Sequence, residues 1–460
     1  MAKVLFTSLG VGPGYTDREE LEKREYRIAD YVFQNSSNVY KTPFIADALC
    51  RHLKIDKIFI FGTNKSMWED AYRFFSRADD DEKLETYIQI AEKIGEQGAP
   101  STLVEADLHI LNEVFDRYLQ EIHPGATGGS ICKVIQDGKN EKEIQENFQI
   151  FMSLQEEIQP GDEIYLDITH SFRSIPLFMY LMIDFIQTLW QKENIKVSGI
   201  YYGMFEAKDT ATGHVPVVDL SPLFELTRWT KGIYEFTNYG NVELLVQLLD
   251  DQELKTTLKN VSNLANLNFI KELRTQVDRL RGLLRDYETT PSSLFYYVKP
   301  QIMDFVEFFK GIESDAKFQF RLAEWFYENG RYANSLICLT ESMVTQIAYL
   351  YRKAGTNIDY KKYNERKTLE KRLLEEEMIY CHDEDYQKAG NLFLEIKKIR
   401  HNAAHAGFLT NVNSQKVIHD LNSYLKQVDS LFFSQEMEKK LSLLPELFPF
   451  ESLKQKGNSN

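Results

Sequence analysis

The chain has 460 residues, of which 43% are hydrophobic and 13% aromatic, and its formal net charge is -15 at pH 7. This length and apolar content suffice for two or three domain cores, and the negative charge argues against a protein that coats nucleic acid non-specifically. The cysteines form no C-x-x-C pair, no signal-peptide pattern opens the chain, and the longest apolar run, 175–190, is too short to span a bilayer comfortably. We therefore expect a cytoplasmic protein with no membrane partner, and we interpret 175–190 as a buried crossover helix.

A strand is predicted at 4–9, and a glycine-rich turn, Gly10-Val11-Gly12-Pro13-Gly14, follows it. Such a turn lets backbone N–H groups approach a phosphate. A dinucleotide-binding fold needs a helix that starts at the third glycine, whereas Pro13 and a charged segment at 15–27 interrupt the pattern here. A Rossmann oxidoreductase is therefore disfavoured, and a plain structural turn stays open as the alternative.

A second strand-to-helix junction, at 163–176, carries more polar chemistry. The apolar strand at 163–167 ends in Asp167-Ile168-Thr169-His170-Ser171, and Phe172 and Arg173 lead into an apolar segment. Hydroxyls, an imidazole and free helix amides thus meet at the carboxyl end of a strand, where open α/β sheets bind ligands and where anions are favoured. A simple helix N-cap is the alternative, although a cap requires neither the imidazole nor the guanidinium.

The pattern of the chain changes once along its length. Strand-like runs alternate with helical ones at 4–9, 57–61, 131–135, 163–167, 197–202 and 217–220, and we expect the last two to pair. This alternation predicts a mostly parallel sheet with helices on both faces. After residue 224, helical periodicities take over, at 242–249, 269–284, 315–329, 332–352, 386–405 and 417–431. The segment 288–293 interrupts them and is a candidate boundary. The predicted fold class is α/β followed by all-α.

The segment Lys397-Lys398-Ile399-Arg400-His401-Asn402-Ala403-Ala404-His405-Ala406-Gly407 concentrates groups that suit RNA cleavage. An imidazole that titrates near neutrality can move the proton of a ribose 2'-hydroxyl or of a leaving 5'-oxygen, and a guanidinium can hold the phosphate. Two alternatives stay open. One is a zinc pair of His401 and His405, which lacks a third ligand nearby, and the other is a solvated helix end with a Gly407 cap. A basic run at 361–372 is compatible with RNA steering or with a solvated helix face.

Arg-x-x-x-x-His near the end of a helical C-terminal region resembles the motif of HEPN ribonucleases. Arg400 and His405 match its two functional positions, His401 fits the polar position after the arginine, and Asn402 follows one place later. The resemblance implies metal-independent RNA transesterification that leaves 2',3'-cyclic phosphate ends. His405 is the expected general acid or base, and Arg400 the group that orients the phosphate. Because the two side chains point about 140° apart on a helix, we expect the site to assemble across a homodimer.

The run Asp167 to Ser171 is similar to the Asp-x-Thr-His-Gly motif of CRISPR-associated CARF proteins, with Ser171 in place of the usual glycine. Residues 6–10 and 57–63 also resemble the first and second strands of that family with their loops. The architecture that these resemblances imply has three parts. They are a Rossmann-like CARF sheet domain over 1–225, a helical linker domain over 226–314 and a helical HEPN domain over 315–460.

Together the resemblances imply a type III CRISPR antiviral ribonuclease that a cyclic oligoadenylate activates and that cleaves single-stranded RNA. Cyclic tetra-adenylate is favoured over cyclic hexa-adenylate as the activator, and neither a cofactor nor a metal is expected. The alternatives are a non-catalytic cyclic-nucleotide sensor or regulator, and a ring nuclease that degrades its own ligand. The expected ligand-binding residues are Ser8, Leu9, Gly10, Gly12, Thr63, Asp167, Thr169, His170, Ser171, Phe172 and Arg173.

Overall fold

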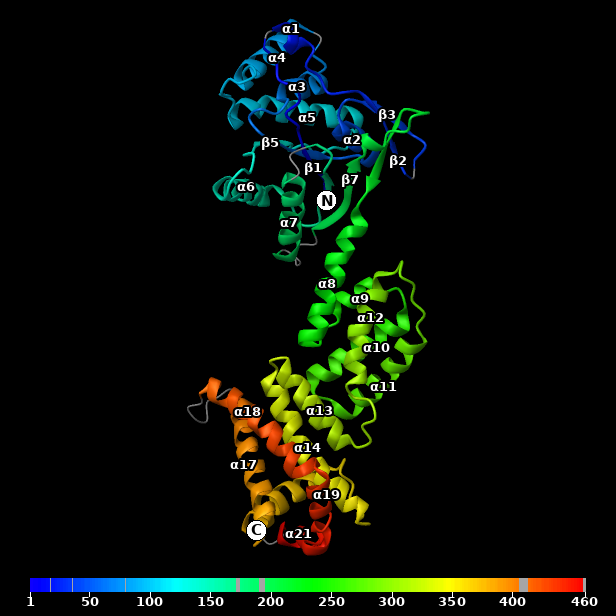
Figure 1. Ribbon diagram of the computed structural model, residues 1–460, viewed down its shortest axis with the longest axis vertical. Coiled ribbons are helices and arrows are strands. Elements are labelled where there is room, and N and C mark those ends of the chain that lie inside the picture. Colours follow the sequence, from blue (N-terminus) through cyan, green and yellow to red (C-terminus); the bar gives the residue numbers. More distant parts are fainter. Residues whose placement is uncertain are drawn as a thin grey trace. The chain divides into compact units, whose positions relative to one another are not determined.

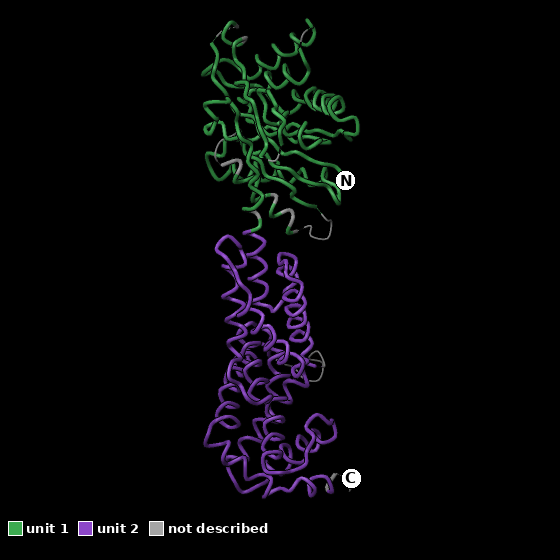
Figure 2. Tube along the Cα trace, turned by 90° about the vertical axis from the view of Figure 1, so that its right-hand side faces the viewer, with its two compact units in different colours: residues 1–225 green, residues 226–460 purple. Residues whose placement is uncertain are grey.

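The computed structural model of the chain describes residues 1–16, 18–34, 36–78, 80–170, 174–189, 195–404 and 413–457. The chain divides into two compact units, Met1–Glu225 and Leu226–Asn460 (Figure 2). All strands in the described ranges belong to the first unit, and the second is helical. The predicted fold class, an α/β part followed by an all-α part, is confirmed.

The first unit is built on an eight-stranded sheet. Every neighbouring pair of strands is parallel except β2–β3 and β7–β8. All the predicted strands are present, and the last two pair as expected. In sheet order the strands are β3 (Val39–Thr42), β2 (Ala29–Phe33), β8 (His214–Asp219), β7 (Lys196–Gly203), β6 (Glu163–Asp167), β1 (Lys3–Ser8), β4 (Lys57–Gly62) and β5 (Ile131–Val134) (Figure 1).

Helices cover both faces of this sheet. Side chains alternate between the two faces along each strand, so one strand contributes to two hydrophobic clusters. Leu5 of β1 belongs to one hydrophobic cluster with residues of α2, α3, α4 and α5, whereas Val4 and Phe6 belong to another with residues of α6 and α7. The prediction of a mostly parallel sheet with helices on both faces is therefore confirmed. The helices of this unit are α1 (Arg18–Glu22), α2 (Ile45–Leu53), α3 (Trp68–Ser76), α4 (Asp81–Ile94), α5 (His109–Ile122), α6 (Glu141–Ser153) and α7 (Ser174–Leu189), with 3₁₀ turns at Glu105–Leu108, Leu154–Glu157 and Phe205–Ala207.

Helix α7 corresponds to the apolar run that was predicted as a buried crossover helix. It connects β6 to β7, and Met179 and Met182 are buried against the sheet. The prediction of full burial was wrong, because Leu177, Leu181 and Phe185 are 61%, 54% and 43% exposed. They recur every four residues and so form the opposite face of the helix, which cannot reach the sheet. Across the described ranges, no helix combines the length and the apolarity that a membrane crossing requires.

Every helix predicted beyond residue 224 is present in the second unit. Helix α8, which begins in the first unit, was not predicted, nor were α10, α12, α16, α19, α20 and α21. The end predicted for α17, His405, lies outside the described residues. Two π-helical stretches, Leu369–Glu377 and Asp429–Phe433, accompany these helices. The helices from α8 onward are α8 (Ser221–Tyr239), α9 (Glu243–Leu248), α10 (Gln252–Leu267), α11 (Ile270–Asp286), α12 (Leu294–Glu307), α13 (Asp315–Glu328), α14 (Tyr332–Lys353), α15 (Tyr363–Thr368), α16 (Met378–Tyr380), α17 (Glu384–Ala404), α18 (Ser414–Val428), α19 (Gln435–Leu441), α20 (Leu444–Leu447) and α21 (Phe450–Gly457).

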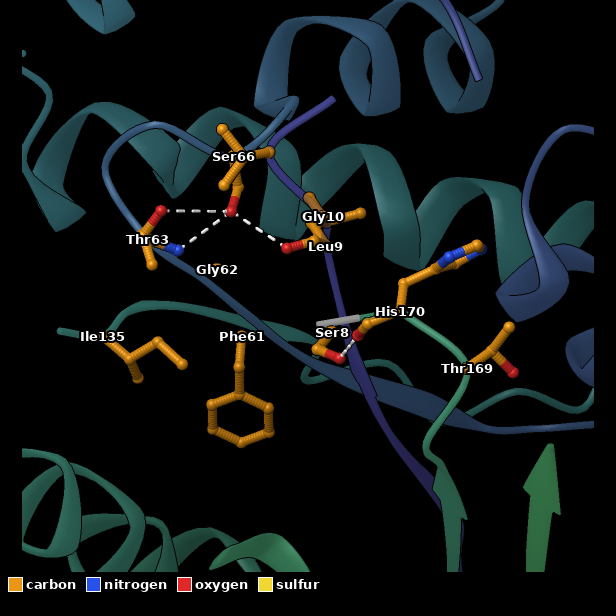
Figure 3. Close-up of a pocket in the computed structure, with 11 residues that line it drawn as sticks. Ser8, Leu9, Gly10, Phe61, Gly62, Thr63, Ser66, Ile135, Thr169 and His170 are labelled. Carbon is orange, nitrogen blue, oxygen red and sulfur yellow. Dashed lines mark hydrogen bonds between the residues drawn. The ribbon is translucent and has the colours of Figure 1, made fainter. Parts of the chain in front are cut away.

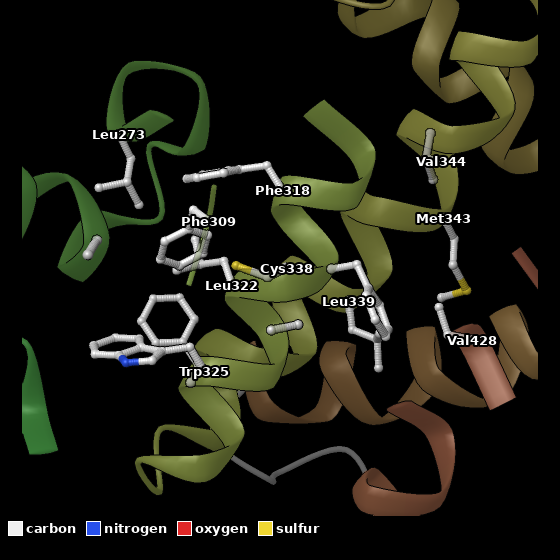
Figure 4. Packing of buried hydrophobic residues seen from close by; sticks show 14 of the residues in the cluster. Leu273, Phe309, Phe318, Leu322, Trp325, Cys338, Leu339, Met343, Val344 and Val428 are labelled. Carbon is white, nitrogen blue, oxygen red and sulfur yellow. The ribbon is translucent and has the colours of Figure 1, made fainter. Parts of the chain in front are cut away.

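One hydrophobic cluster runs through the second unit (Figure 4). It includes Leu273 of α11, Phe318 of α13, Leu339 of α14 and Val428 of α18. Helix α14 is central to it and contacts α13, α17 and α18. The predicted break at 288–293 does separate α11 from α12, yet residues on both sides of it share this cluster. The subdivision into parts at 226–314 and 315–460 therefore remains a prediction.

Candidate functional site

A cavity of about 520 Å³ lies at the carboxyl ends of β1, β4, β5 and β6 (Figure 3). From β1, the sheet continues through β4 and β5 on one side and through β6 and β7 on the other. The cavity thus lies at a topological switch point, where open α/β sheets bind their ligands. Its lining residues are Ser8, Leu9, Gly10, Val11, Phe61, Gly62, Thr63, Ser66, Ile135, Thr169 and His170.

Ser66 joins the loops that follow β1 and β4. Its hydroxyl donates to the carbonyl of Leu9 at 2.9 Å and accepts a hydrogen bond from the backbone N–H of Thr63, also at 2.9 Å. Figure 3 shows these bonds at the upper rim of the cavity. Ser66 was not among the residues predicted from the sequence, although a serine three residues after a threonine that follows a strand is a typical turn-forming pattern.

A buried ion pair supports the loop after β1 from behind. Arg24 Nη1 lies 2.6 Å from Glu69 Oε1, and these side chains are 4% and 0% exposed. The other guanidinium nitrogens donate to the carbonyls of Val11 at 2.7 Å and Pro13 at 2.8 Å. Burial raises the pKa of Glu69 to about 7, although Arg24 lowers it. The loop that carries Val11 is therefore held in one conformation by side-chain bonds to its backbone.

Gly12 serves packing in this loop, and it is not among the residues that line the cavity. Its φ of +62° lies in the left-handed region, which favours glycine. A Cβ at this position would lie 2.1 Å from Sδ of Met67. The ligand contact predicted for Gly12 therefore has no geometric support from the described residues.

Asp167 shapes the end of β6 without reaching the cavity. It is fully buried and accepts hydrogen bonds from the Thr7 hydroxyl at 2.6 Å and the Thr169 N–H at 2.9 Å. The Thr169 hydroxyl in turn accepts a bond from the N–H of Gly203 in β7 at 2.9 Å. Ser8 of β1 donates to the carbonyl of His170. These bonds join three strands and fix the backbone that lines the cavity.

His170 contributes a neutral imidazole at the edge of this cavity. Burial lowers its pKa, whereas Asp167 and Glu206 raise it. Its Nε2 is shielded from solvent and has no hydrogen-bond partner in the described part of the chain. The ring lies against Tyr26, with 5.4 Å between centroids, and Figure 3 shows it directed away from Phe61. The next three predicted ligand residues, Ser171, Phe172 and Arg173, lie outside the described residues.

No described lining residue of this cavity carries a charged side chain. The polar groups that face a ligand are hydroxyls and backbone amides. The N–H groups of Gly10 and Val11 donate to no acceptor among the residues that the structure describes. Such groups can bind phosphate oxygens without a formal positive charge. These two N–H groups are therefore candidates to bind an anion, and the phosphate contact of the glycine-rich turn stays a prediction.

The predicted catalytic residues lie on the last described turns of α17. Arg400 is half-buried, and its Nε is shielded and lacks a hydrogen-bond partner in the described ranges. His401 is exposed, whereas Asn402 is only 8% exposed. His405 lies outside the described residues, so the structure places Arg400, His401 and Asn402 without it. Among described residues, no group of three or more His, Cys, Asp or Glu side chains is arranged to hold a metal ion.

Carboxylates pair with two of the six cations of the basic run at 361–372 and with the first residue of the motif segment. Arg366 pairs with Glu341 of α14, and Arg372 lies 2.9 Å from Glu376. Lys397 lies between two glutamates, Glu370 and Glu375, at 2.6 Å from the first. The other four cations of the run, Lys361, Lys362, Lys367 and Lys371, form no ion pair with a described residue. RNA steering and a solvated helix face therefore both stay open as interpretations of this run.

Comparison with known proteins gives matches over nearly the whole chain. Residues 4–206 match the family model of the CARF domain of the CRISPR system endoribonuclease Csx1, and residues 225–314 match that of the second domain of CRISPR-associated protein MJ1674. The CRISPR-associated protein MJ1674 of Methanocaldococcus jannaschii is 37% identical over 448 residues, which cover 95% of this chain and 68% of that protein. The structure of Enterococcus italicus Csm6 bound to cyclic hexa-2'-fluoro-hexa-dAMP aligns with a TM-score of 0.43 at 13% identity, covering 100% of this chain and 99% of that one.

Proposed function

Because the chain belongs to the family of the CRISPR-associated protein MJ1674 and carries a CARF domain, we propose that it is a cyclic oligoadenylate-activated, metal-independent RNA endonuclease of a type III CRISPR response. The observation that carries the proposal is the cavity at the carboxyl ends of β1, β4 and β6. It lies inside the region that matches the CARF model, and the Asp-x-Thr-His motif forms one of its walls.

The chemistry of the cavity suits part of a cyclic oligonucleotide. The free N–H groups of Gly10 and Val11 suit phosphate oxygens, and the hydroxyls of Thr63 and Ser8 suit ribose or base edges. A volume of about 520 Å³ lies within the range of pockets for small ligands. A ring of four nucleotides is larger than such a ligand, so we propose that two copies of the chain share one ring as a homodimer.

The RNA chemistry belongs to Arg400 and His405. As general base, an imidazole takes the proton of the ribose 2'-hydroxyl, and the resulting oxygen attacks the adjacent phosphorus. The bond to the 5'-oxygen breaks, that oxygen receives a proton from a general acid, and a 2',3'-cyclic phosphate remains. Arg400 orients the phosphate and stabilises the extra negative charge of the transition state.

Asn402 and His401 are proposed to position these groups. The low exposure of Asn402 suits a residue that orders the helix end, whereas the exposed His401 can reach RNA directly. Because side chains five residues apart on a helix point about 140° from each other, we propose that each site uses residues of both protomers. The name of the matched model, an endoribonuclease, is in line with this activity.

The test is to incubate the full chain with end-labelled single-stranded RNA, with and without cyclic tetra-adenylate or cyclic hexa-adenylate. We expect cleavage with one of the two rings, cyclic tetra-adenylate being favoured, and product ends that acid treatment opens to monophosphates. Ligand binding without any RNA cleavage would instead establish the non-catalytic sensor. Conversion of the ring to linear products without RNA cleavage would establish the ring nuclease.

A further inference from the structure

We propose that two adjoining cavities in the second unit form a binding site for single-stranded RNA, lined by none of the described candidate catalytic residues. The inference rests on the proposed function for the identity of the ligand. The cavities have volumes of about 340 Å³ and about 480 Å³. They share three lining residues, Asp315, Thr345 and Tyr360, so they lie on either side of a common wall. Side chains of α11, α13 and α14 and of the segment 354–366 contribute to the lining.

The charge of this surface indicates an anionic ligand. Three of its cations are already paired with carboxylates: Arg274 with Asp315, Lys353 with Glu438 and Arg366 with Glu341. The other three, Lys271, Arg352 and Lys361, form no ion pair with any carboxylate in the described part of the chain. One lining carboxylate, Glu313, also has no ion pair among the described residues, so the unpaired cations outnumber it three to one. Such an excess of positive charge is unexpected in a chain with a net charge of -15. Such cations bind phosphates and release counterions.

The ring of Tyr360 lies between the two cavities, and hydrogen bonds fix its position. The Tyr360 hydroxyl donates to Asp315 Oδ2 at 3.0 Å, and Arg274 holds the other oxygen of that carboxylate at 2.5 Å. Arg352 and Lys361 lie 5.3 Å and 6.0 Å from the centroid of the Tyr360 ring, within cation–π range. The two unpaired cations are thereby positioned at the wall between the two cavities.

Two further groups favour nucleotides over simple anions. Tyr349 lines the larger cavity and is 41% exposed, and Lys353 Nζ lies over one face of its ring at 6.0 Å from the centroid, which leaves the other face for a base. Gln319 lines the smaller cavity, and its shielded Oε1 accepts no hydrogen bond from the described residues. An N–H on the edge of a base would satisfy that oxygen. In the two adjoining cavities, the cations suit phosphates, the tyrosine ring suits a base and the amide oxygen suits a base edge. This set of groups suits successive nucleotides of one strand.

The test uses the full chain with His405→Ala, so that RNA stays intact during binding. In that background we compare Arg352→Gln with Lys361→Gln against a matched control, Lys255→Gln with Lys426→Gln. The control removes the same charge from α10 and α18 at residues that line neither cavity. Fluorescence anisotropy with a labelled adenine-rich RNA gives Kd at several salt concentrations. We expect about tenfold weaker binding in the first pair, and a salt slope smaller by about 0.7 per lost phosphate contact.

Equal Kd and equal salt slope in the two double variants would overturn the inference. Displacement of the RNA by AMP at similar affinity would also overturn it, because it would indicate a pocket for a mononucleotide. Gln319→Ala provides a second variant, and we expect it to weaken binding without changing the salt slope. The proposed function fails separately. Wild type that binds RNA here but cleaves none contradicts only the nuclease, whereas cleavage with unchanged KM by the Arg352 and Lys361 variant contradicts only the site proposed here.

Discussion

The two units assemble their candidate sites in different ways. In the first unit, Ser8, Thr63 and Thr169 are far apart in sequence and meet because parallel strands end at one edge of the sheet. In the second unit, Arg400 and Asn402 are close in sequence on one turn of α17. A helix distributes neighbouring side chains around its axis, at about 100° per residue. A sheet edge can therefore complete a cavity within one chain, whereas this helix end needs a second surface to do so.

The units also differ in how they would hold an anion. The described lining of the sheet cavity has no charged side chain and offers hydroxyls and backbone amides. The surface around Tyr360 has cations without carboxylate partners in the described ranges. Backbone donors recognise a ligand by shape, whereas exposed cations attract any polyanion and are sensitive to salt. This contrast fits a selective sensor joined to a less selective RNA-binding part.

The largest expected effect is that of His405→Ala, which should remove RNA cleavage and leave ligand binding by the first unit unchanged. RNA cleavage should fall by roughly 10²–10⁴-fold, because a placed imidazole contributes about that much to proton transfer. Binding of cyclic oligoadenylate should not change, because the proposed ligand groups lie in the first unit. Single-turnover cleavage and calorimetry on the same preparation measure both quantities.

His419→Ala in α18 is the matched control, since it removes an exposed imidazole elsewhere in the second unit. Arg400→Ala should resemble His405→Ala. A mixed dimer of one Arg400→Ala chain and one His405→Ala chain keeps one arginine and one histidine across the interface and should recover part of the activity. Wild-type cleavage by the His405→Ala homodimer would show that the motif is only a helix end.

A second prediction concerns a double variant that should weaken binding of the cyclic ligand and leave the helical unit folded. Thr169→Ala with His170→Ala should raise the Kd for cyclic oligoadenylate by about tenfold or more. The change removes the acceptor of the Gly203 N–H, and an unsatisfied buried amide costs about 1–3 kcal/mol in the strand end that lines the cavity. Calorimetry of ligand binding tests this expectation, with circular dichroism as the check that the helical unit stays folded.

Thr169→Ser is the conservative control for that double variant. It keeps the hydroxyl that accepts from Gly203 and should bind the ligand nearly as well as wild type. Unchanged affinity in the double variant would move the ligand away from this cavity.

A smaller effect concerns pH. Burial lowers the pKa of His170 from the ordinary value of 6.5, so the unfolded chain binds a proton more readily than the folded one. The free energy of unfolding should therefore decrease as the pH falls below 6.5 toward the folded-state pKa, and this contribution is complete above 6.5. Thermal unfolding followed from about pH 7.5 to about pH 5 should show a steeper loss of Tm in wild type than in His170→Asn. An identical pH dependence in both proteins would contradict the assignment of this loss to His170.

The smallest expected effect is that of a chelator. Cleavage should continue at an unchanged rate in excess EDTA, because an imidazole and a guanidinium supply the proton transfer and the charge stabilisation. A loss of cleavage that manganese or magnesium restores would contradict the metal-independent mechanism. In that case the second unit would hold a metal ion that takes part in cleavage.

Strong periodicity made most of the fold predictable from sequence. Buried parallel strands such as β4 appear as continuous apolar runs, and α14 shows a helical period over its whole length. The strands β2 and β3 were missed. In β3, at one edge of the sheet, only Thr42 is buried, so the strand has no apolar run, and β2 alternates buried and partly buried residues. Such strands depend on pairing with a neighbour, and this pairing is not encoded in their own residues.

The sequence by itself predicted which residues carry chemistry: the strand-end polar groups of 167–170, and Arg400 and His405. Only the tertiary structure decided which of them face a ligand. It turned Asp167 and Gly12 into supports of the backbone, and it brought Ser66 and Arg24 into the same loop system. It also brought Lys271 to the same two cavities as Arg352 and Lys361, which lie far from it in sequence. The reason is physical: the chemistry of a side chain is a local property, whereas its burial, its partners and its uncompensated charge depend on segments that only folding brings together.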